Sequence, residues 1–193
     1  MPAAVGTVIL VGGGLLTGGL EGTATAKDPG FATYKTFAKA EDFAMARETQ
    51  RAGQERGTAF AHYHTGRQPL LGISFSTREW FRRVRIDNDI VGVFAEDEAT
   101  EGAHRVVASP GFAVAAVDIQ ADEHINAIRV QFAALEGGAL SPSDRYWSKW
   151  VGSYHRNEPT VLLEGGSALV VGLRGARGMV LNSLSLLIAQ PEN

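Results

Sequence analysis

Short apolar runs rich in Val, Ile, Phe and Trp follow one another from Thr58 to the C-terminus, with polar turns about every 8 to 12 residues. Runs of this kind are typical of the strands of an all-β sandwich, barrel or prism. No helical pattern alternates with them, which argues against a parallel βαβ sheet. The strands expected are 58–64, 69–75, 80–87, 90–95, 104–109, 113–119, 125–134, 145–152, 159–164, 168–174 and 180–189. Turns are expected at Asp87-Asn88, Glu101-Gly102, Ser109-Pro110-Gly111, Ser141-Pro142-Ser143-Asp144 and Glu164-Gly165-Gly166.

The apolar pattern repeats three times. Residues 72–86, 116–130 and 172–186 align without a gap, and the copies start 44 and then 56 residues apart. In each copy, two apolar stretches of period two flank a polar or small turn, which predicts a β-hairpin with one buried face. Three such hairpins can bury these faces around a common axis. The apolar positions that coincide are Ile73, Val117 and Leu173; Phe81, Ile125 and Leu181; Val84, Ile128 and Leu184; and Ile86, Val130 and Leu186.

The fold predicted is therefore all-β, a three-sided β-prism with a pseudo-threefold repeat over residues 57–190. A short helical or flexible N-terminal segment precedes it. Residues 35–56 are rich in Ala, Glu, Lys and Arg with a thin apolar face, which predicts a short polar helix inside a linker of residues 27–56. Residues 3–20 carry no charge, are close to the length of a membrane-spanning helix and contain six glycines. Residues 1–26 are expected to be a signal or membrane-anchor segment, with a flexible glycine-rich tail as the alternative.

Composition narrows the class of function. A chain of 193 residues, 45% of them hydrophobic, fits one main domain. The net charge of -3 does not indicate nucleic-acid binding, which depends on clustered positive charge. The cluster Arg78, Arg82, Arg83 and Arg85 is interpreted as a solvated strand face. The absence of cysteine excludes disulfides, thiolate metal sites and a cysteine nucleophile. No hydrolase elbow, phosphate loop or zinc-protease motif occurs, so neither an enzyme nor a cofactor is expected.

Three other groups of residues carry possible chemistry. His62 and His64 lie two apart on an expected strand, a spacing that can chelate a metal, but no third ligand accompanies them and an ordinary solvent-facing strand is preferred. The acidic run 96–98 is interpreted as a solvated hairpin tip rather than a calcium site. Trp147 and Trp150 are expected on opposite faces of one strand, so that at most one of them faces a ligand.

Residues 158–188, EPTVLLEGGSALVVGLRGARGMVLNSLSLLI, resemble the last repeat of the jacalin-related lectins. The likeness lies in a proline, an apolar strand, a glycine-containing turn, V-V-G-L-R-G and then G-x-x-x-N before a strand. Weaker similarity extends back through INAIRVQF to about Gly57. The chain is also similar to a lectin-like module of bacterial membrane or secreted proteins, at Arg145-Tyr146, Ser148–Gly152 and Val170–Leu173. The resemblance implies a jacalin-like β-prism, carbohydrate binding without catalysis, and a secreted or membrane-anchored, extracytoplasmic location.

The resemblance also implies a sugar site at one end of the prism, built from the G-x-x-x-D loop of the last repeat and a glycine near the start of the domain. The matching loop assigns ligand contacts to Gly178, Met179, Val180 and Asn182. Asn182 replaces the family's carboxylate, and an amide cannot accept two sugar hydroxyls as a carboxylate does. Met179 and Val180 stand where many such lectins have aromatic residues.

Two questions about this site stay open in the sequence. The glycine near the start of the domain is either Gly57 or Gly66. Asn182 shares its phase in the repeat with Asn126, so the alternative role of both is to hydrogen-bond the backbone of their turns.

Two functions follow. The first is a non-catalytic carbohydrate-binding domain whose partner is a glycan or glycoconjugate. The alternative is a structural or oligomerising domain without sugar binding, in which the N-terminal segment contacts a second copy or a membrane.

Overall fold

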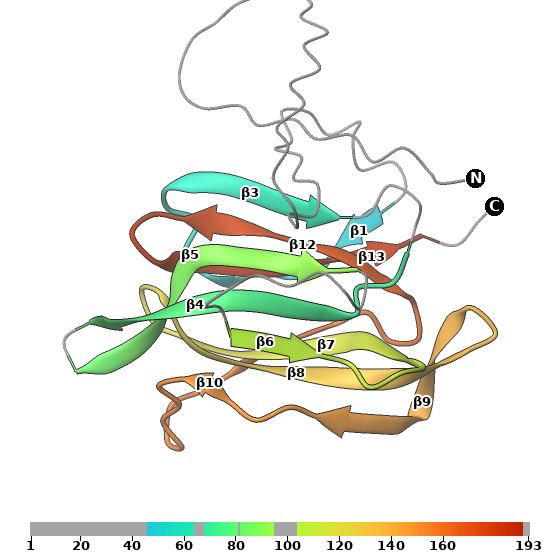
Figure 1. Ribbon diagram of the computed structural model, residues 1–193. Helices are drawn as coiled ribbons and strands as arrows, with labels where there is room; N and C mark the ends of the chain where they lie inside the picture. The colour runs from blue at the N-terminus through green and yellow to red at the C-terminus, as the bar shows by residue number, and fades with distance from the viewer. Residues whose placement is uncertain (1–45, 64–67, 81, 95–103, 191–193) are drawn as a thin grey trace, which may run out of the picture.

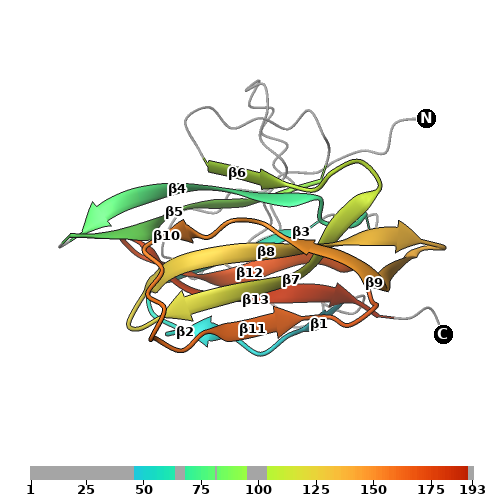
Figure 2. The ribbon, with the colours of Figure 1, turned by 90° about the horizontal axis from the view of Figure 1, so that it is seen from below.

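The computed structural model describes residues 46–63, 68–80, 82–94 and 104–190, which form three antiparallel sheets (Figure 1, Figure 2). The first sheet has the order β1-β13-β12-β3 with β2 also on β13, the second β10-β8-β7-β11 with β9 also on β8, and the third β5-β4-β6. These ranges contain no helix, and the predicted three-sided β-prism is confirmed. The strands are β1 (Ala46–Glu48), β2 (Ala52–Gly53), β3 (Thr58–Tyr63), β4 (Gly72–Trp80), β5 (Arg83–Val93), β6 (His104–Val107), β7 (Phe112–Ala121), β8 (Ile125–Glu136), β9 (Ala139–Trp147), β10 (Val151–Gly152), β11 (Val161–Glu164), β12 (Val170–Arg177) and β13 (Leu181–Ala189).

Each copy of the repeat forms one hairpin: β4 with β5, β7 with β8, and β12 with β13. Ile73, Val117 and Leu173 are fully buried in one core cluster, so the apolar faces of the hairpins meet as predicted. A further strand pairs with the first strand of each hairpin at the same position. The residues opposite these three are Val106, Leu163 and His62.

The second strand of the first hairpin departs from the gapless alignment. Phe75 pairs with Ile90, with 14 residues between them, whereas its counterpart Ile119 pairs with Ile128, with 8 residues between them. The first hairpin is therefore six residues longer toward its tip. Val84, which the alignment matched with Ile128, lies in this extension and is 38% exposed, so its predicted core position is wrong. Ile90 takes that position and is fully buried.

The residues before the predicted domain boundary are extended rather than helical. β1 and β2 pair with β13, with Ala46 opposite Ala189 and Gly53 opposite Ser183. The predicted helix over 35–56 is therefore wrong from residue 46 onward, and its first part lies outside the described residues. Pairing with the free edge of β13 overrides the helical preference of Ala, Glu and Arg. The sheets include residues from Ala46, not from residue 57.

Two predicted turns lie inside strands. Residues 141–144 belong to β9, whose register steps from Arg145 opposite Ala133 to Leu140 opposite Leu135. They form a bulge on an outer strand, where a proline costs no ladder hydrogen bond. Asp87-Asn88 likewise lies within β5, at the irregularity between the pairs of Phe75 and Thr77. The turn composition was correct as a signal of local irregularity, but the strands continue through it.

Two outer strands are interrupted in the same way. Between β1 and β2, the Thr49 hydroxyl accepts the Leu186 N–H at 3.0 Å, and the Thr49 N–H donates to the Leu186 carbonyl at 3.0 Å. Between β9 and β10, Ser148 makes the same two bonds with Val130, at 2.9 and 2.8 Å. A hydroxyl thus replaces one backbone acceptor, and the chain leaves the sheet briefly before it re-enters at β2 or β10. The pattern is a second internal repeat, of outer strands rather than hairpins.

Candidate functional site

The predicted ligand loop is the tip of the third hairpin, between β12 and β13. The Gly178 N–H donates to the Val180 carbonyl at 3.0 Å, which closes a tight turn. Gly178 is exposed and Met179 is 58% exposed. Val180, by contrast, is buried and forms a β-bridge with Asp87, and Asn182 is only 6% exposed. Of the four residues predicted to contact a ligand, Gly178 and Met179 are therefore exposed, whereas Val180 and Asn182 are buried.

The Asn182 amide joins three segments of the chain. Its Nδ2 donates to the Arg56 carbonyl at 2.7 Å, and its Oδ1 faces His124 Nδ1 at 2.7 Å. Because a carbonyl only accepts, the amide nitrogen must face Arg56, and the oxygen then accepts a hydrogen bond from the N–H of the His124 ring. Asn182 thus holds residues 54–57, which we call the first arm, and the tip of the second hairpin against the third. Its partner is the backbone of the arm rather than of its own turn.

Gly57 is the glycine that meets this loop. Its backbone has a φ of 92°, and a Cβ on it would lie 2.3 Å from the Arg177 carbonyl oxygen and 3.3 Å from the Gly178 nitrogen. Only glycine allows the first arm to lie this close to the third hairpin tip. Of the two glycines that the sequence left open, Gly57 lies beside this loop, and Gly66 lies outside the described residues.

The second hairpin has an equivalent arm, residues 153–156, which we call the second arm. The Ser153 N–H donates to the Asn126 carbonyl at 3.0 Å, as the Gln54 N–H does to the Asn182 carbonyl at 3.0 Å. Gln120 then fixes this arm: it donates to the His155 carbonyl at 2.7 Å and accepts the His155 N–H at 2.6 Å. Gln120 thus binds the His155 carbonyl, which is the equivalent of the Arg56 carbonyl bound by Asn182. Asn126 therefore cannot make the contact that Asn182 makes.

Asn126 is consequently buried, and neither of its amide atoms makes a hydrogen bond of normal geometry. It lies near enough to Asp122 to help to lower the pKa of that carboxyl. Burial alone would raise the Asp122 pKa, but the His124 N–H, at 3.0 Å from its Oδ1, and the charges of Arg85 and Arg83 outweigh burial and lower it. The sequence offered hydrogen bonding to the backbone of their own turns as the alternative role of Asn126 and Asn182. Neither side chain makes that bond: Asn182 binds the backbone of the first arm, and Asn126 binds no backbone group.

Three of the four arginines of the cluster are paired within the protein rather than simply solvated. Arg83 and Arg85 lie 3.3 and 3.7 Å from Asp122, and Arg78 lies 3.2 Å from Asp87. These carboxylates offset much of the positive charge that a phosphate backbone would require.

The two tryptophans lie on one face, contrary to the prediction. The Arg129 guanidinium carbon is 4.4 Å from the ring centroid of Trp147 and 4.8 Å from that of Trp150. Trp150 also stacks on Tyr154, with centroids 4.3 Å apart. The period-two rule fails because the chain leaves the sheet between β9 and β10. Arg129 therefore packs against both indole rings, and Trp150 and Tyr154 each use one ring face to stack on the other.

His62 is buried, not solvent-facing as preferred from the sequence. It is 4% exposed, and burial, with the nearby charge of Arg177, lowers its pKa to about 3. It is therefore neutral at physiological pH. His64 and the acidic run 96–98 lie outside the described residues. No group of three His, Asp or Glu side chains that could hold a metal occurs in the described part of the chain. The same ranges contain no helix of the length and hydropathy needed to cross a bilayer.

Comparison with solved structures identifies the architecture. The chain is similar to the mannose-binding lectin from Champedak, with a TM-score of 0.50 and 11% identity over 76% of this chain and 99% of that one. It is also similar to single-chain recombinant jacalin, with a TM-score of 0.49 and 16% identity over 78% and 100% of the two chains. No family model matches the sequence, and comparison with curated protein sequences finds no relative. The protein has the β-prism fold of the jacalin-related lectins.

Proposed function

We propose that this domain binds carbohydrate without catalysis, at the junction of the third hairpin tip and the first arm. The observation that carries the proposal is the contact of Gly57 with Arg177 and Gly178. It brings together the two parts that the lectin resemblance requires, which are 121 residues apart in sequence, from 57 to 178. The fold gives further support, because the similar lectin from Champedak is described as mannose-binding.

The exposed residues of the junction suit a sugar. The apolar Met179 side chain can pack on the nonpolar face of a pyranose, and two glycines leave the backbone open to hydroxyl groups. Val180 and Asn182 support the loop from below, so their contribution to binding is to hold its shape. In this arrangement the contacts come from the backbone and one flexible side chain, which fits weak binding strengthened by multivalency.

A glycan array with the full chain tests the proposal. We expect binding to a subset of glycans, and Met179→Ala to weaken it about tenfold through lost apolar contact. Leu162→Ala is the matched control, because Leu162 is also a large exposed apolar residue, at 41%, but lies on β11. Its affinity should be unchanged. Failure of the wild-type chain to bind any glycan at high concentration would overturn the proposal, and so would an equal loss in both variants.

We also propose that the protein is secreted or membrane-anchored. The support is the uncharged run of residues 3–20 and the similarity to a module of bacterial membrane or secreted proteins. Fractionation of cells that express the tagged full chain tests this location. Recovery only in the cytoplasmic fraction would refute it.

A further inference from the structure

The outer strands of the first and second sheets carry equivalent rows of side chains. Each residue of one row lies 99 positions before its counterpart: 48 and 147, 51 and 150, 55 and 154. The equivalence is set by pairing, since Glu48 lies opposite Leu187 as Trp147 lies opposite Gln131. The last member of each row lies in an arm, Glu55 in the first and Tyr154 in the second.

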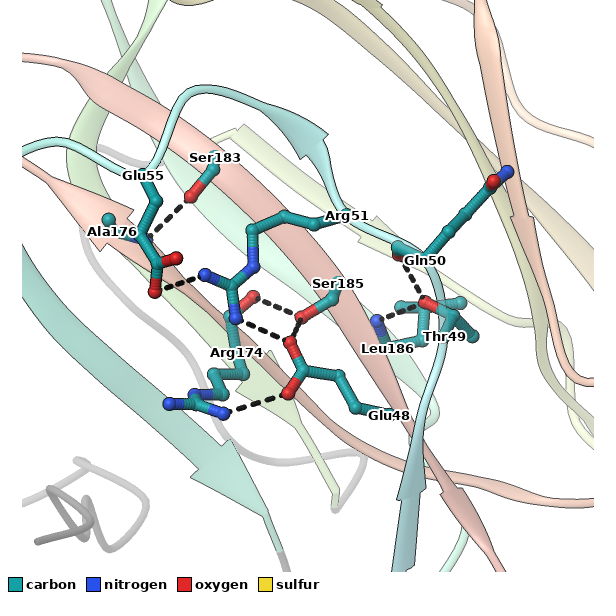
Figure 3. A network of polar contacts seen from close by, with 10 residues as sticks. All are labelled: Glu48, Thr49, Gln50, Arg51, Glu55, Arg174, Ala176, Ser183, Ser185 and Leu186. Carbon is teal, nitrogen blue, oxygen red and sulfur yellow. Dashed lines mark hydrogen bonds and ion pairs between the residues drawn. The ribbon is translucent and has the colours of Figure 1, made fainter.

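In the first sheet the row is ionic, and we call Glu48, Arg51 and Glu55 the ionic ladder (Figure 3). Glu48 accepts hydrogen bonds from Arg51 at 2.6 Å, from Ser185 at 2.7 Å and from Arg174 at 2.8 Å. Arg51 also contacts the Glu55 carboxylate, so its guanidinium lies between the two carboxylates. The ladder therefore runs from the sheet, through Arg51, to the first arm.

In the second sheet the same row is aromatic, and we call Trp147, Trp150 and Tyr154 the aromatic ladder. Arg129 lies between the two indole rings and is held by Asp118, to which its Nε and Nη2 donate at 3.0 and 2.7 Å. Trp150 stacks on Tyr154 at an interplanar angle of 12°. This ladder also runs from the sheet to an arm, but its contacts are dispersion and cation-π contacts.

From these two ladders we infer that Arg51 is a positioning residue for the proposed sugar site, because it ties the first arm to the sheet. The inference rests on the proposed function only for its effect on binding. The arm carries both the Arg56 carbonyl that holds Asn182 and the Gly57 that meets the third hairpin tip. At its start the arm is fixed by the Gln54 bond to Asn182, and Glu55 supplies the next attachment.

The chemistry of the ladder makes this attachment sensitive to salt. The Glu55 side chain is 67% exposed and that of Arg51 is 20% exposed, so dissolved ions reach the outer ion pair and screen it. The stacked rings of the aromatic ladder carry no such dependence beyond Arg129, whose partner carboxylate, Asp118, is only 7% exposed. The first arm should therefore loosen as salt rises while the second arm stays closed.

Hydrogen exchange of the full chain tests the inference without any ligand. In Arg51→Met, which keeps an apolar stem but removes both ion pairs, we expect the amides of residues 54–57 to exchange about fivefold faster. Those of residues 153–156 serve as the internal control and should not change. Arg51→Lys should restore most of the protection, and 1 M salt should mimic Arg51→Met in the wild type. The inference would be overturned if the amides of residues 54–57 exchanged at the same rate in the wild type, in Arg51→Met and in 1 M salt, as those of residues 153–156 should.

A second measurement determines the affinity for a glycan selected on the array. Arg51→Met should weaken its affinity about fivefold, Arg51→Lys should restore it, and the midpoint of thermal unfolding should change little in either variant. Trp150→Met, the matched change in the aromatic ladder, should leave this affinity unchanged. An affinity unaffected by Arg51→Met would overturn the inference. If no glycan binds the wild type, the proposed function fails, whereas the exchange result still decides whether the ladder holds the arm.

Discussion

Replacing Asn182 by Asp would give this chain the carboxylate that the lectin family has at the equivalent position. The structure predicts that the change is harmful. One side of the Asn182 amide faces the Arg56 carbonyl oxygen at 2.7 Å, and this contact needs a donor. A carboxylate there would place a negatively charged oxygen against a carbonyl oxygen, at a residue that is only 6% exposed. The other side, toward His124, would tolerate the change.

The size of the effect follows from the lost bond. A buried acceptor left without its donor costs about 1 to 3 kcal/mol, and the repulsion adds to it, so we expect Asn182→Asp to reduce the free energy of unfolding by about 2 kcal/mol at pH 7. In a protein of this size that lowers the unfolding midpoint by about 4 to 8 °C. The deficit should shrink in acid, because a proton on the new carboxyl restores a donor toward the Arg56 carbonyl.

Denaturant unfolding of both proteins between pH 4 and about 8 measures this. The matched control is Asn157→Asp, the same change of charge at an exposed residue, which should alter the unfolding free energy by about 0.5 kcal/mol or less. The reasoning fails if Asn182→Asp is as stable as the wild type at pH 7, or if its deficit grows as the pH falls. Tighter glycan binding by Asn182→Asp would show that the first arm is not needed at the site.

Three further predictions concern stability, each measured by denaturant unfolding. Glu48→Gln should cost about 1 kcal/mol at pH 7. Burial would raise the Glu48 pKa, but the hydrogen bonds from Arg51 and Ser185 and the charge of Arg174 lower it from 4.5. The stability that the Glu48 carboxylate contributes is therefore present above pH 4.5 and should be lost as the pH falls further. A difference in unfolding free energy between wild type and Glu48→Gln that stays constant down to pH 3 would contradict this. Gly152→Ala should cost about 3 kcal/mol, because a Cβ there lies 2.1 Å from the Asn126 carbonyl, whereas Gly111→Ala, with a similar φ and nothing within 4 Å, should cost about 1 kcal/mol; equal costs would refute the steric argument. Leu184→Ala should cost about 3 kcal/mol and Val84→Ala about 0.5 kcal/mol, since only the first is buried; a comparable loss at Val84 would restore the gapless alignment.

The hairpins could be predicted from the sequence because their apolar positions follow period two. Ile73, Val117 and Leu173 each stand in a local pattern that says which face is buried, and all three are buried in one core. The six-residue extension of the first hairpin was missed because the apolar Val84 and Ile86 fit the gapless alignment equally well. The pairing partner of Phe75, not its local pattern, decides the register.

Two outer strands, β1 and β2, could not be predicted because their stability comes from pairing with distant residues. Residues 46–53 favour a helix by composition, and only the free edge of β13 makes them extended. One signal was nevertheless present. The sequences TQRAG at 49–53 and SKWVG at 148–152 share a hydroxyl residue, a small or branched apolar residue and a glycine at the same spacing.

The loop of the candidate site could be located from the sequence, but the exposure of its residues could not. A resemblance to a motif gives the positions of Gly178 and Asn182 and says nothing of which side chains lie at the surface. The burial of Asn182 depends on the carbonyl of Arg56 and on His124, which come from two other parts of the chain.

The strands that pair in the first sheet are synthesised at different times. Its strands β1, β2 and β3 are made early, but β12 and β13 follow about 100 residues later. At about 5 to 20 residues per second, the early strands wait on the order of 5 to 20 seconds without partners on the ribosome. We therefore expect nascent chains that stop before residue 170 to remain open to proteases and chaperones, and residues 170–189 to trigger closure of the whole domain.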